Sequence, residues 1–232
     1  MTGYISVPFY DLSHERRVVP GIRAGLRPLL AGSRRSILEI GAGTGLITVS
    51  LADLTPGEVF ALEPAADMRA VLVSRLSSRP ELLSRVTVLP CDALSVRLDE
   101  PAEAVVMVNV LQALEPDYRG RLWPVLAAAL EPAGRLVFNW HDGGPPGPGQ
   151  RLESHQVGRH TYTVVSEILE SGEEGCRVRY VYRITEGDTV ISEEELTGRS
   201  YWPNGNVLRR ELTDAGFIEA DRAEGLVAWR LT

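Results

Sequence analysis

A chain of 232 residues, 44% of them hydrophobic, can bury a sizeable core and fits one decorated domain. Its net charge of −7 argues against nucleic acid as a partner, because phosphate binding needs a basic surface. The two cysteines, Cys91 and Cys176, lie far apart and outside any Cys/His cluster, which suggests neither a disulfide framework nor a zinc site. Since we find neither a signal-peptide core nor a run of about 18 apolar residues, we expect a cytoplasmic protein that binds no membrane.

The first strong structural pattern is a short apolar segment, residues 36–40, that runs into Gly41, Gly43 and Gly45. Residues 46–51 then begin an amphipathic helix. Glycine allows a turn with positive φ, and its missing Cβ lets a ligand lie against the main chain. The pattern therefore predicts a nucleotide-like ligand at the carboxyl end of a parallel strand.

The spacing of this loop narrows the choice of ligand. A dinucleotide site would show Gly-x-Gly-x-x-Gly, whereas the glycines here alternate and follow Glu39. A P-loop is excluded, since no Gly-Lys-Ser/Thr follows and the chain contains no lysine. Because a carboxylate is a poor neighbour for a pyrophosphate, a cationic or zwitterionic ligand fits this loop better.

Further strands are predicted at residues 58–62, 85–89 and 104–108, each followed by polar residues at its carboxyl end. The short segments that carry these polar residues are Glu63-Pro64, Cys91-Asp92-Ala93 and Asn109. Residues 130–138 supply a turn and a fifth strand. Together with Glu39-x-Gly41-x-Gly43-x-Gly45, this order resembles the Rossmann-like (class I) S-adenosylmethionine (SAM) methyltransferases along residues 36–140. The resemblance implies SAM as the cofactor.

Several residue roles follow from that resemblance alone. It implies that Glu63 binds both ribose hydroxyls, that Asp92 accepts from the adenine amine, and that Tyr10 lays its ring near the sulfonium, where a cation–π contact contributes ~0.5–2 kcal/mol. Asn109 is expected to face the methionine end through its carbonyl. The complete implied set is Tyr10, Glu39, Gly41, Ala42, Gly43, Glu63, Pro64, Met68, Asp92, Ala93 and Asn109.

The expected fold class is α/β, a Rossmann-like, doubly wound and mostly parallel sheet with additions. We expect a helical lid at 1–35, the SAM-binding core at 36–142, a loop and antiparallel β insertion at 143–200, and a helix and hairpin at 201–232 that complete the core sheet. Residues 143–149, rich in Gly and Pro, predict a loop, and alternation within 160–199 predicts three strands. In architecture the insertion resembles the β-layer of sugar-amine N-methyltransferases, where it roofs the active site or joins subunits into a homodimer.

The resulting hypothesis is methyl transfer from SAM to a small-molecule acceptor in specialised metabolism. The reaction needs a base only if the nucleophile arrives protonated. His14 and His141 are the candidate bases, and Tyr10 is the third candidate catalytic residue. Intramolecular SAM cyclisation, pericyclic catalysis and a silent SAM-binding scaffold stay open on this fold, and a nicotinamide-dependent oxidoreductase is a further alternative.

Overall fold

The computed structural model describes residues 7–232. The core contains α1 (Val7–His14), α2 (Val19–Leu29), β1 (Ile37–Ile40), α3 (Leu46–Leu54), β2 (Val59–Leu62), α4 (Ala66–Ser77), η1 (Pro80–Leu82), β3 (Val86–Leu89), η2 (Ala93–Ser95), β4 (Ala102–Met107), η3 (Leu111–Ala113), α5 (Pro116–Ala129) and β5 (Leu130–Asn139). The rest contains β6 (Gly149–Val157), β7 (His160–Gly172), β8 (Gly175–Glu186), β9 (Thr189–Tyr201), α6 (Gly205–Asp214), β10 (Phe217–Ala223) and β11 (Leu226–Leu231).

A seven-stranded sheet in the order β10-β11-β5-β4-β1-β2-β3 forms the centre of the molecule. Strands β1 to β5 pair in parallel, and β11 pairs antiparallel with both β5 and β10. The chain runs outward from β1 to β2 and β3, and then returns to place β4 on the other side of β1. Such a reversal opens a crevice at the carboxyl ends of the strands, which is where open α/β sheets bind ligands. The predicted fold class is confirmed.

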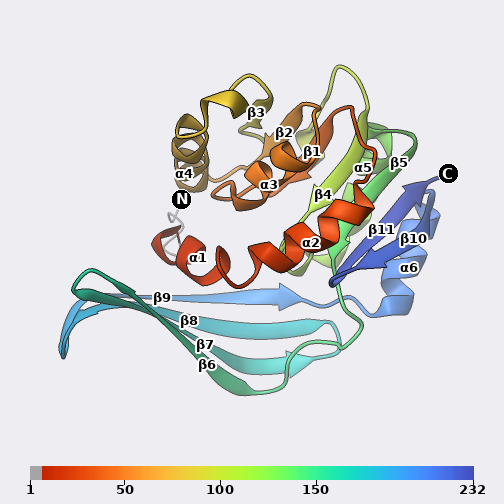
Figure 1. Cartoon of the computed structure of the whole chain (residues 1–232). Helices are drawn as coiled ribbons and strands as arrows, with labels where there is room; N and C mark the ends of the chain where they lie inside the picture. Colours follow the sequence, from red (N-terminus) through yellow and green to blue (C-terminus); the bar gives the residue numbers. More distant parts are fainter. Residues whose placement is uncertain (1–6) are drawn as a thin grey trace.

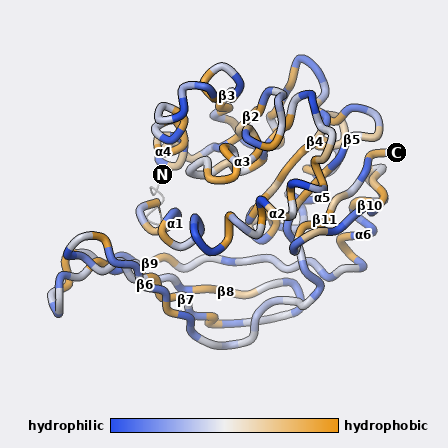
Figure 2. Tube along the Cα trace, viewed as in Figure 1, coloured by the Kyte–Doolittle hydropathy of each residue, from blue (hydrophilic) through white to orange (hydrophobic). Residues whose placement is uncertain are grey.

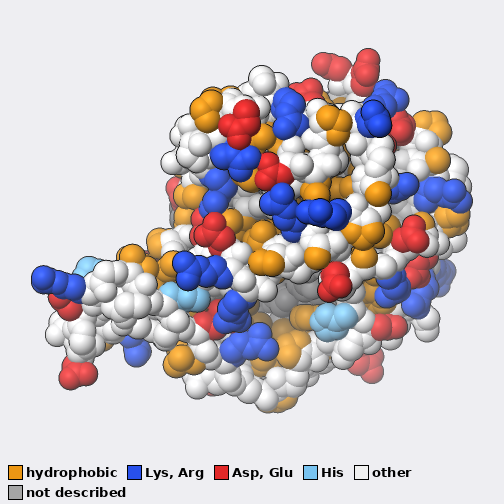
Figure 3. Space-filling model, in the orientation of Figure 1, with side chains coloured by type: hydrophobic (Ala, Val, Ile, Leu, Met, Phe, Trp, Pro, Cys, Tyr) orange, Lys and Arg blue, Asp and Glu red, His pale blue; other side chains and the backbone are white. Residues whose placement is uncertain are grey.

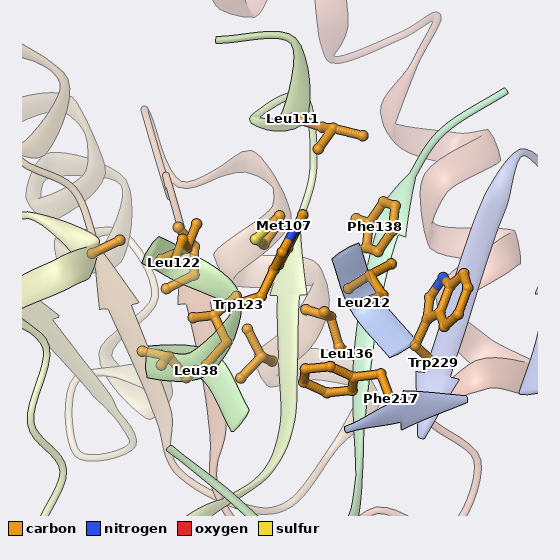
Figure 4. Close-up of a cluster of buried hydrophobic side chains, with 14 of the residues drawn as sticks. Leu38, Met107, Leu111, Leu122, Trp123, Leu136, Phe138, Leu212, Phe217 and Trp229 are labelled. Atoms are coloured by element: carbon orange, nitrogen blue, oxygen red, sulfur yellow. The ribbon is translucent and has the colours of Figure 1, made fainter. Parts of the chain in front are cut away.

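Both faces of this sheet are covered, so its central strands are apolar along their whole length. All four residues of β1 are buried, and successive side chains enter opposite core clusters because a strand alternates its faces. Figure 2 shows the hydrophobic stretches gathered along these central strands. One cluster, drawn in Figure 4, packs Trp123, Met107 and Phe138 against Leu212 and Trp229 from the C-terminal segment. The C-terminal helix and hairpin therefore complete the core.

The insertion after β5 is a separate four-stranded antiparallel sheet in the order β6-β7-β8-β9. Figure 1 shows it as a layer under α1 and α2, on the side of the molecule away from β2 and β3. The three strands predicted within residues 160–199 are confirmed as β7, β8 and β9, whereas β6, which precedes them, was not predicted. Strand β6 pairs along its whole length with β7, although most of its residues are exposed and polar. This edge strand therefore forms because it pairs with β7, although its sequence lacks the alternation of hydrophobic residues that would predict a strand.

A helical lid was expected over residues 1–35, of which residues 1–6 lie outside the described part of the chain. The described part holds two helices, α1 and α2, joined by a short turn. Pro20 lies in the first turn of α2, where its missing N–H costs no helical hydrogen bond. Within residues 7–232, no helix combines the length and the hydropathy needed to cross a bilayer.

Candidate functional site

A cavity of about 650 Å³ lies at the carboxyl ends of β1, β2 and β4. Its walls come from the loop after each of these strands, from the start of α5 and from α1. Nine of the predicted ligand-binding residues line it: Tyr10, Gly41, Gly43, Glu63, Pro64, Met68, Asp92, Ala93 and Asn109. The fold thus brings together residues that lie up to about a hundred positions apart in the sequence.

The glycines of the loop after β1 serve different purposes. Gly43 has φ +57, and a Cβ placed on it would meet no atom within 4 Å, so this part of the loop is open to a ligand. Gly41 has φ +71, and a Cβ there would come within 2.6 Å of Cγ2 of Val110. The missing side chain of Gly41 therefore lets the loop after β4 pack against the glycine loop, while that of Gly43 leaves room in the cavity.

Glu63, directly after β2, is held firmly although it faces the cavity. Its Oε2 accepts the backbone N–H of Gly43 at 2.9 Å, and its Oε1 accepts the N–H of Ala65 at 2.8 Å. The residue is only 7% exposed. Each carboxylate oxygen keeps a further lone pair for a hydroxyl donor, so Glu63 can both tie the loop to β2 and accept two hydrogen bonds from a ligand.

Asp92 has two partners near the cavity wall. Its Oδ1 accepts the N–H of Leu94 at 2.9 Å and so caps η2, and the hydroxyl of Tyr118 on α5 donates to both carboxylate oxygens at 2.9–3.0 Å. Burial, reinforced by this carboxylate, raises the pKa of Tyr118 to about 12, so the phenol keeps its proton. Tyr118 was not expected from the sequence, because a tyrosine on a helix carries no motif of its own.

Three consecutive residues of α1 connect it to three parts of the molecule. Phe9 packs on Tyr162 and Tyr182 of the inserted sheet, with ring centroids 5.3 and 5.1 Å apart. Tyr10 lines the cavity. Asp11 accepts hydrogen bonds from Thr44 of the glycine loop and from Arg75 of α4. The predicted lid is therefore fastened to the cavity rim on one side and to the insertion on the other.

The phenol of Tyr10 is protonated in this setting. Burial raises its pKa above the ordinary value, a side-chain hydrogen bond with Asn109 opposes that rise, and the carboxylates of Glu39, Asp11 and Glu63 add to it. One face of the ring stacks on His14, with centroids 4.1 Å apart. Tyr10 can thus donate a hydrogen bond or offer its ring to a cation, but it is a poor base at neutral pH.

Two residues of the expected set turn away from the cavity. Ala42 packs into a core cluster, and Glu39 is only 2% exposed, with its carboxylate accepting the hydroxyl of Thr48 at 2.6 Å. Burial raises the pKa of Glu39 to about 7, and the nearby charge of Glu63 adds to the shift while Thr48 opposes it. A cofactor-binding role for either residue stays a prediction, and contact through the Glu39 side chain is blocked by its burial.

The candidate bases lie beside the cavity rather than in it. His14 lines a small hollow of about 280 Å³ that shares Tyr10 with the main cavity. His141 lies in a third hollow of about 780 Å³, under the Gly/Pro loop, and its ring contacts Trp202 at 4.8 Å between centroids. Arg151, Ser166 and Tyr180 line both of these hollows, which adjoin along the inserted sheet. The catalytic roles of His14, His141 and Tyr10 stay predictions.

The face of the molecule seen in Figure 3 is mixed in charge, with arginines interspersed among acidic side chains and no continuous basic stripe. Among the described residues that line the cavity, the acids Glu63, Asp92, Glu115 and Asp117 outnumber the single cation Arg121. A ligand with positive charge suits such a lining.

Comparison with known proteins agrees with this geometry. Residues 37–134 match the family model described as "Methyltransferase domain". Uncharacterized methyltransferases of Mycobacterium tuberculosis and Mycobacterium bovis are 31% identical over 113 residues. That match covers 49% of this chain and 42% of each relative, so the chain spans less than half the length of these relatives.

Solved structures match over nearly the whole chain. An amino pentose methyltransferase, CalS10, from Micromonospora echinaspora superposes with a TM-score of 0.77 at 18% identity, covering 100% of this chain and 99% of its own. DesVI of Streptomyces venezuelae gives 0.79 at 18% identity, with 99% of each chain covered. The sugar N-methyltransferase KedS8 from Streptoalloteichus gives 0.77 at 17% identity, with 100% and 94% covered. At these identities the likeness concerns the fold.

The sheet order, the glycine loop and the matched segment agree with one another. Residues 37–134 are similar to the methyltransferase-domain family, and the whole chain has the fold of solved methyltransferases, among them CalS10, which was solved with SAM bound. The resemblance seen in the sequence is confirmed.

The buried Glu39 gives a prediction about stability. Because its pKa is raised to about 7 in the folded chain, the folded state binds a proton more tightly than the unfolded state does. The contribution of Glu39 to the free energy of unfolding should be greatest below its ordinary pKa of about 4.5 and should be lost, by about 1.4 kcal/mol per pH unit, as pH rises toward 7. Urea titrations of wild type and Glu39→Gln between these limits should show this contribution as a difference in slope, with the wild type losing stability relative to the variant as pH rises. Equal slopes would contradict the assignment.

Proposed function

We propose that this protein transfers the methyl group of SAM to a small-molecule acceptor, in a pathway of specialised metabolism. The observation that carries the proposal is the carboxylate of Glu63, fixed by Gly43 and Ala65 at the switch point of the sheet. The acceptor class draws support from the printed names of the similar structures, which include an amino pentose methyltransferase and a sugar N-methyltransferase.

The residues around the cavity fit SAM. Gly43 leaves room where a Cβ would intrude, Glu63 offers acceptors for a cis-diol, and the acid-rich lining suits a cation. Asp92 and the Ala93 amide would face the adenine, Met68 would lie against its ring, and Asn109 would face the methionine end. Bound SAM supplies a methyl group on a positive sulfur, so these residues mainly have to hold donor and nucleophile in line.

We place the acceptor in the two hollows along the inserted sheet. The smaller hollow adjoins the main cavity at Tyr10, and the larger one adjoins the smaller along the sheet. Their walls combine aromatic residues, such as Tyr180 and Trp202, with polar ones, such as Ser166. In this arrangement the inserted sheet roofs the active site. Tyr10, which lines both the cavity and the smaller hollow, would lie where donor and acceptor meet.

Incubation with SAM alone separates this proposal from its rivals on the same fold. A methyltransferase leaves SAM intact until an acceptor is added and then forms S-adenosylhomocysteine (SAH). Consumption of SAM without an acceptor would instead favour intramolecular cyclisation. A protein that binds SAM but forms no SAH with any amine or hydroxyl acceptor would favour a silent scaffold.

We expect Glu63→Ala to weaken SAM binding, because the variant loses a charged acceptor for the ribose hydroxyls. Such a loss costs about 1.5–3 kcal/mol, or roughly 10- to 150-fold in affinity. Equilibrium dialysis with labelled SAM measures it. Asp67→Asn, an exposed residue on the first turn of α4, is the matched control and should bind as wild type does. Unchanged affinity of Glu63→Ala would remove this residue from the site.

If the nucleophile arrives protonated, a base is needed, and loss of a general base typically costs about 10²–10⁴-fold in rate. We expect His141→Ala to lower kcat on that scale while leaving SAM affinity unchanged, and His14→Ala is the alternative to compare. His160→Ala is the control at the start of β7. Initial rates of SAH formation with a reactive acceptor provide the measurement. Full activity in either variant would exclude that histidine as the base.

We propose in addition that the inserted sheet joins two copies of the chain. Leu152 lies on the face of this sheet opposite the hollow-lining Ser166 and Tyr180, and it is 65% exposed. Sedimentation equilibrium should give twice the chain mass of 25.4 kDa, and Leu152→Glu should shift it toward the monomer. Ile218 is also an exposed apolar residue but lies on β10 of the core sheet, so Ile218→Glu should leave the mass unchanged. A monomeric wild type would contradict the proposal.

A further inference from the structure

The carboxylate of Asp92 depends on a side chain for its orientation. Asp92 lines the cavity but is exposed, so packing does not fix it. The backbone N–H of Leu94 donates to Oδ1 at 2.9 Å, and the hydroxyl of Tyr118 lies 3.0 Å from Oδ1 and 2.9 Å from Oδ2, so its single proton is shared between them. Within residues 7–232, Tyr118 is the one side chain that donates to Asp92. Glu63, by contrast, is held by two backbone donors.

Tyr118 itself is held in place by its neighbours. It lies in the first turn of α5, and the next residue, Arg119, is buried and donates to both carboxylate oxygens of Glu211 on α6, at 2.7 and 2.8 Å. Arg121, nearly one turn further along α5, places its guanidinium 5.8 Å from the centre of the Tyr118 ring, within the range of a cation–π contact. The phenol therefore reaches Asp92 from a helix that is fixed to the core.

These contacts leave the carboxylate of Asp92 with acceptor capacity for a ligand. An ionised carboxylate offers about four acceptor sites and no donor. Leu94 and Tyr118 both donate to Oδ1, whereas Oδ2 accepts from Tyr118 alone and keeps a site free. A ligand amine can donate to that site, but a ligand carbonyl oxygen there would face a negative charge. Purines differ in this respect, because adenine carries an amine where hypoxanthine and guanine carry a carbonyl.

We propose that Tyr118 is a positioning residue that holds the carboxylate of Asp92 so that the cavity selects adenine over purines with a carbonyl at the same place. This inference rests on the proposed function, in which Asp92 faces the adenine of SAM. Without the phenol hydroxyl, the bond from Leu94 alone holds the carboxylate, which can then turn about its Cβ–Cγ bond. The base selection would lose sharpness, although Asp92 would still be present.

Tyr118→Phe tests this role because it removes the hydroxyl and keeps the ring. Calorimetry measures the binding of SAH and of S-inosylhomocysteine, its deaminated analogue, which carries the carbonyl. We expect the wild type to prefer SAH by roughly 10- to 150-fold, the range of one hydrogen bond to a charged group. Tyr118→Phe should narrow that preference by about fivefold, the size of one ordinary hydrogen bond, through weaker binding of SAH. A general loosening of the cavity would instead weaken both ligands alike.

Tyr201→Phe is the matched control. The hydroxyl of Tyr201 donates to Glu115, another acid of the cavity wall, at 3.1 Å. This variant therefore frees a carboxylate in the same way without touching Asp92, and it should keep the wild-type preference. Asp92→Ala should by itself narrow the preference for SAH, and in that background Tyr118→Phe should narrow it no further.

The possible outcomes separate the inference from the proposed function. An unchanged preference in Tyr118→Phe, an equal narrowing in Tyr201→Phe, or a further narrowing in the Asp92→Ala background would overturn the inference. A wild type that binds SAH and S-inosylhomocysteine equally well would also overturn it, while leaving the binding of an adenosyl ligand intact. A wild type that binds neither compound would refute the proposed function, and the inference with it.

Discussion

The hydrogen bonds of one carboxylate hold the candidate site together. Glu63 accepts the N–H of Gly43 from the loop after β1 and the N–H of Ala65 from the residue before α4. Because charge-assisted bonds to backbone donors are strong and short, they fix two loops that could otherwise move independently. Gly43 can lack a side chain, and so leave this part of the loop open to a ligand, because Glu63 holds its backbone N–H in place.

The remaining parts of the site are arranged around that anchor. The helix α1 bonds through Asp11 to Thr44 and Arg75 on one side, and packs through Phe9 on the inserted sheet on the other. Tyr10 lies between these two contacts, where the cavity meets the smaller hollow along the inserted sheet. A change in the position of α1 would therefore alter the donor side and the acceptor side together, which suits a reaction that needs both partners aligned.

Much of this could be predicted from the sequence, because parallel sheets place the ends of their strands side by side. The glycine loop, Glu63 and Asp92 each follow a predicted strand, and the structure brings them to one cavity. The fold class followed from the same order of strands. Sequence patterns of this kind are local. They predict a site correctly where the fold only has to bring the ends of neighbouring strands together.

The features that the sequence did not predict also have physical causes. Strand β6 shows little alternation and forms because β7 offers it an unpaired edge, which no local pattern reveals. The burial of the Glu39 side chain, which bonds Thr48, was also not predicted; all of β1 is buried, and a cofactor-binding role of Glu39 stays a prediction. Asn139 and Tyr118 act through side chains that fold onto Asn109 and Asp92 from other elements. Only Asn139 carried a signal in the sequence, because it is a polar residue at the end of a buried strand.

The central claim is that the cavity at the carboxyl ends of β1, β2 and β4 was built for an adenosyl sulfonium. Calorimetric titration of the full chain with SAH, and separately with NADH, tests it most directly. The structure predicts one SAH bound per chain, displaced by SAM, and no heat with NADH. Saturable binding of NADH, or the absence of heat with SAH, would contradict the account.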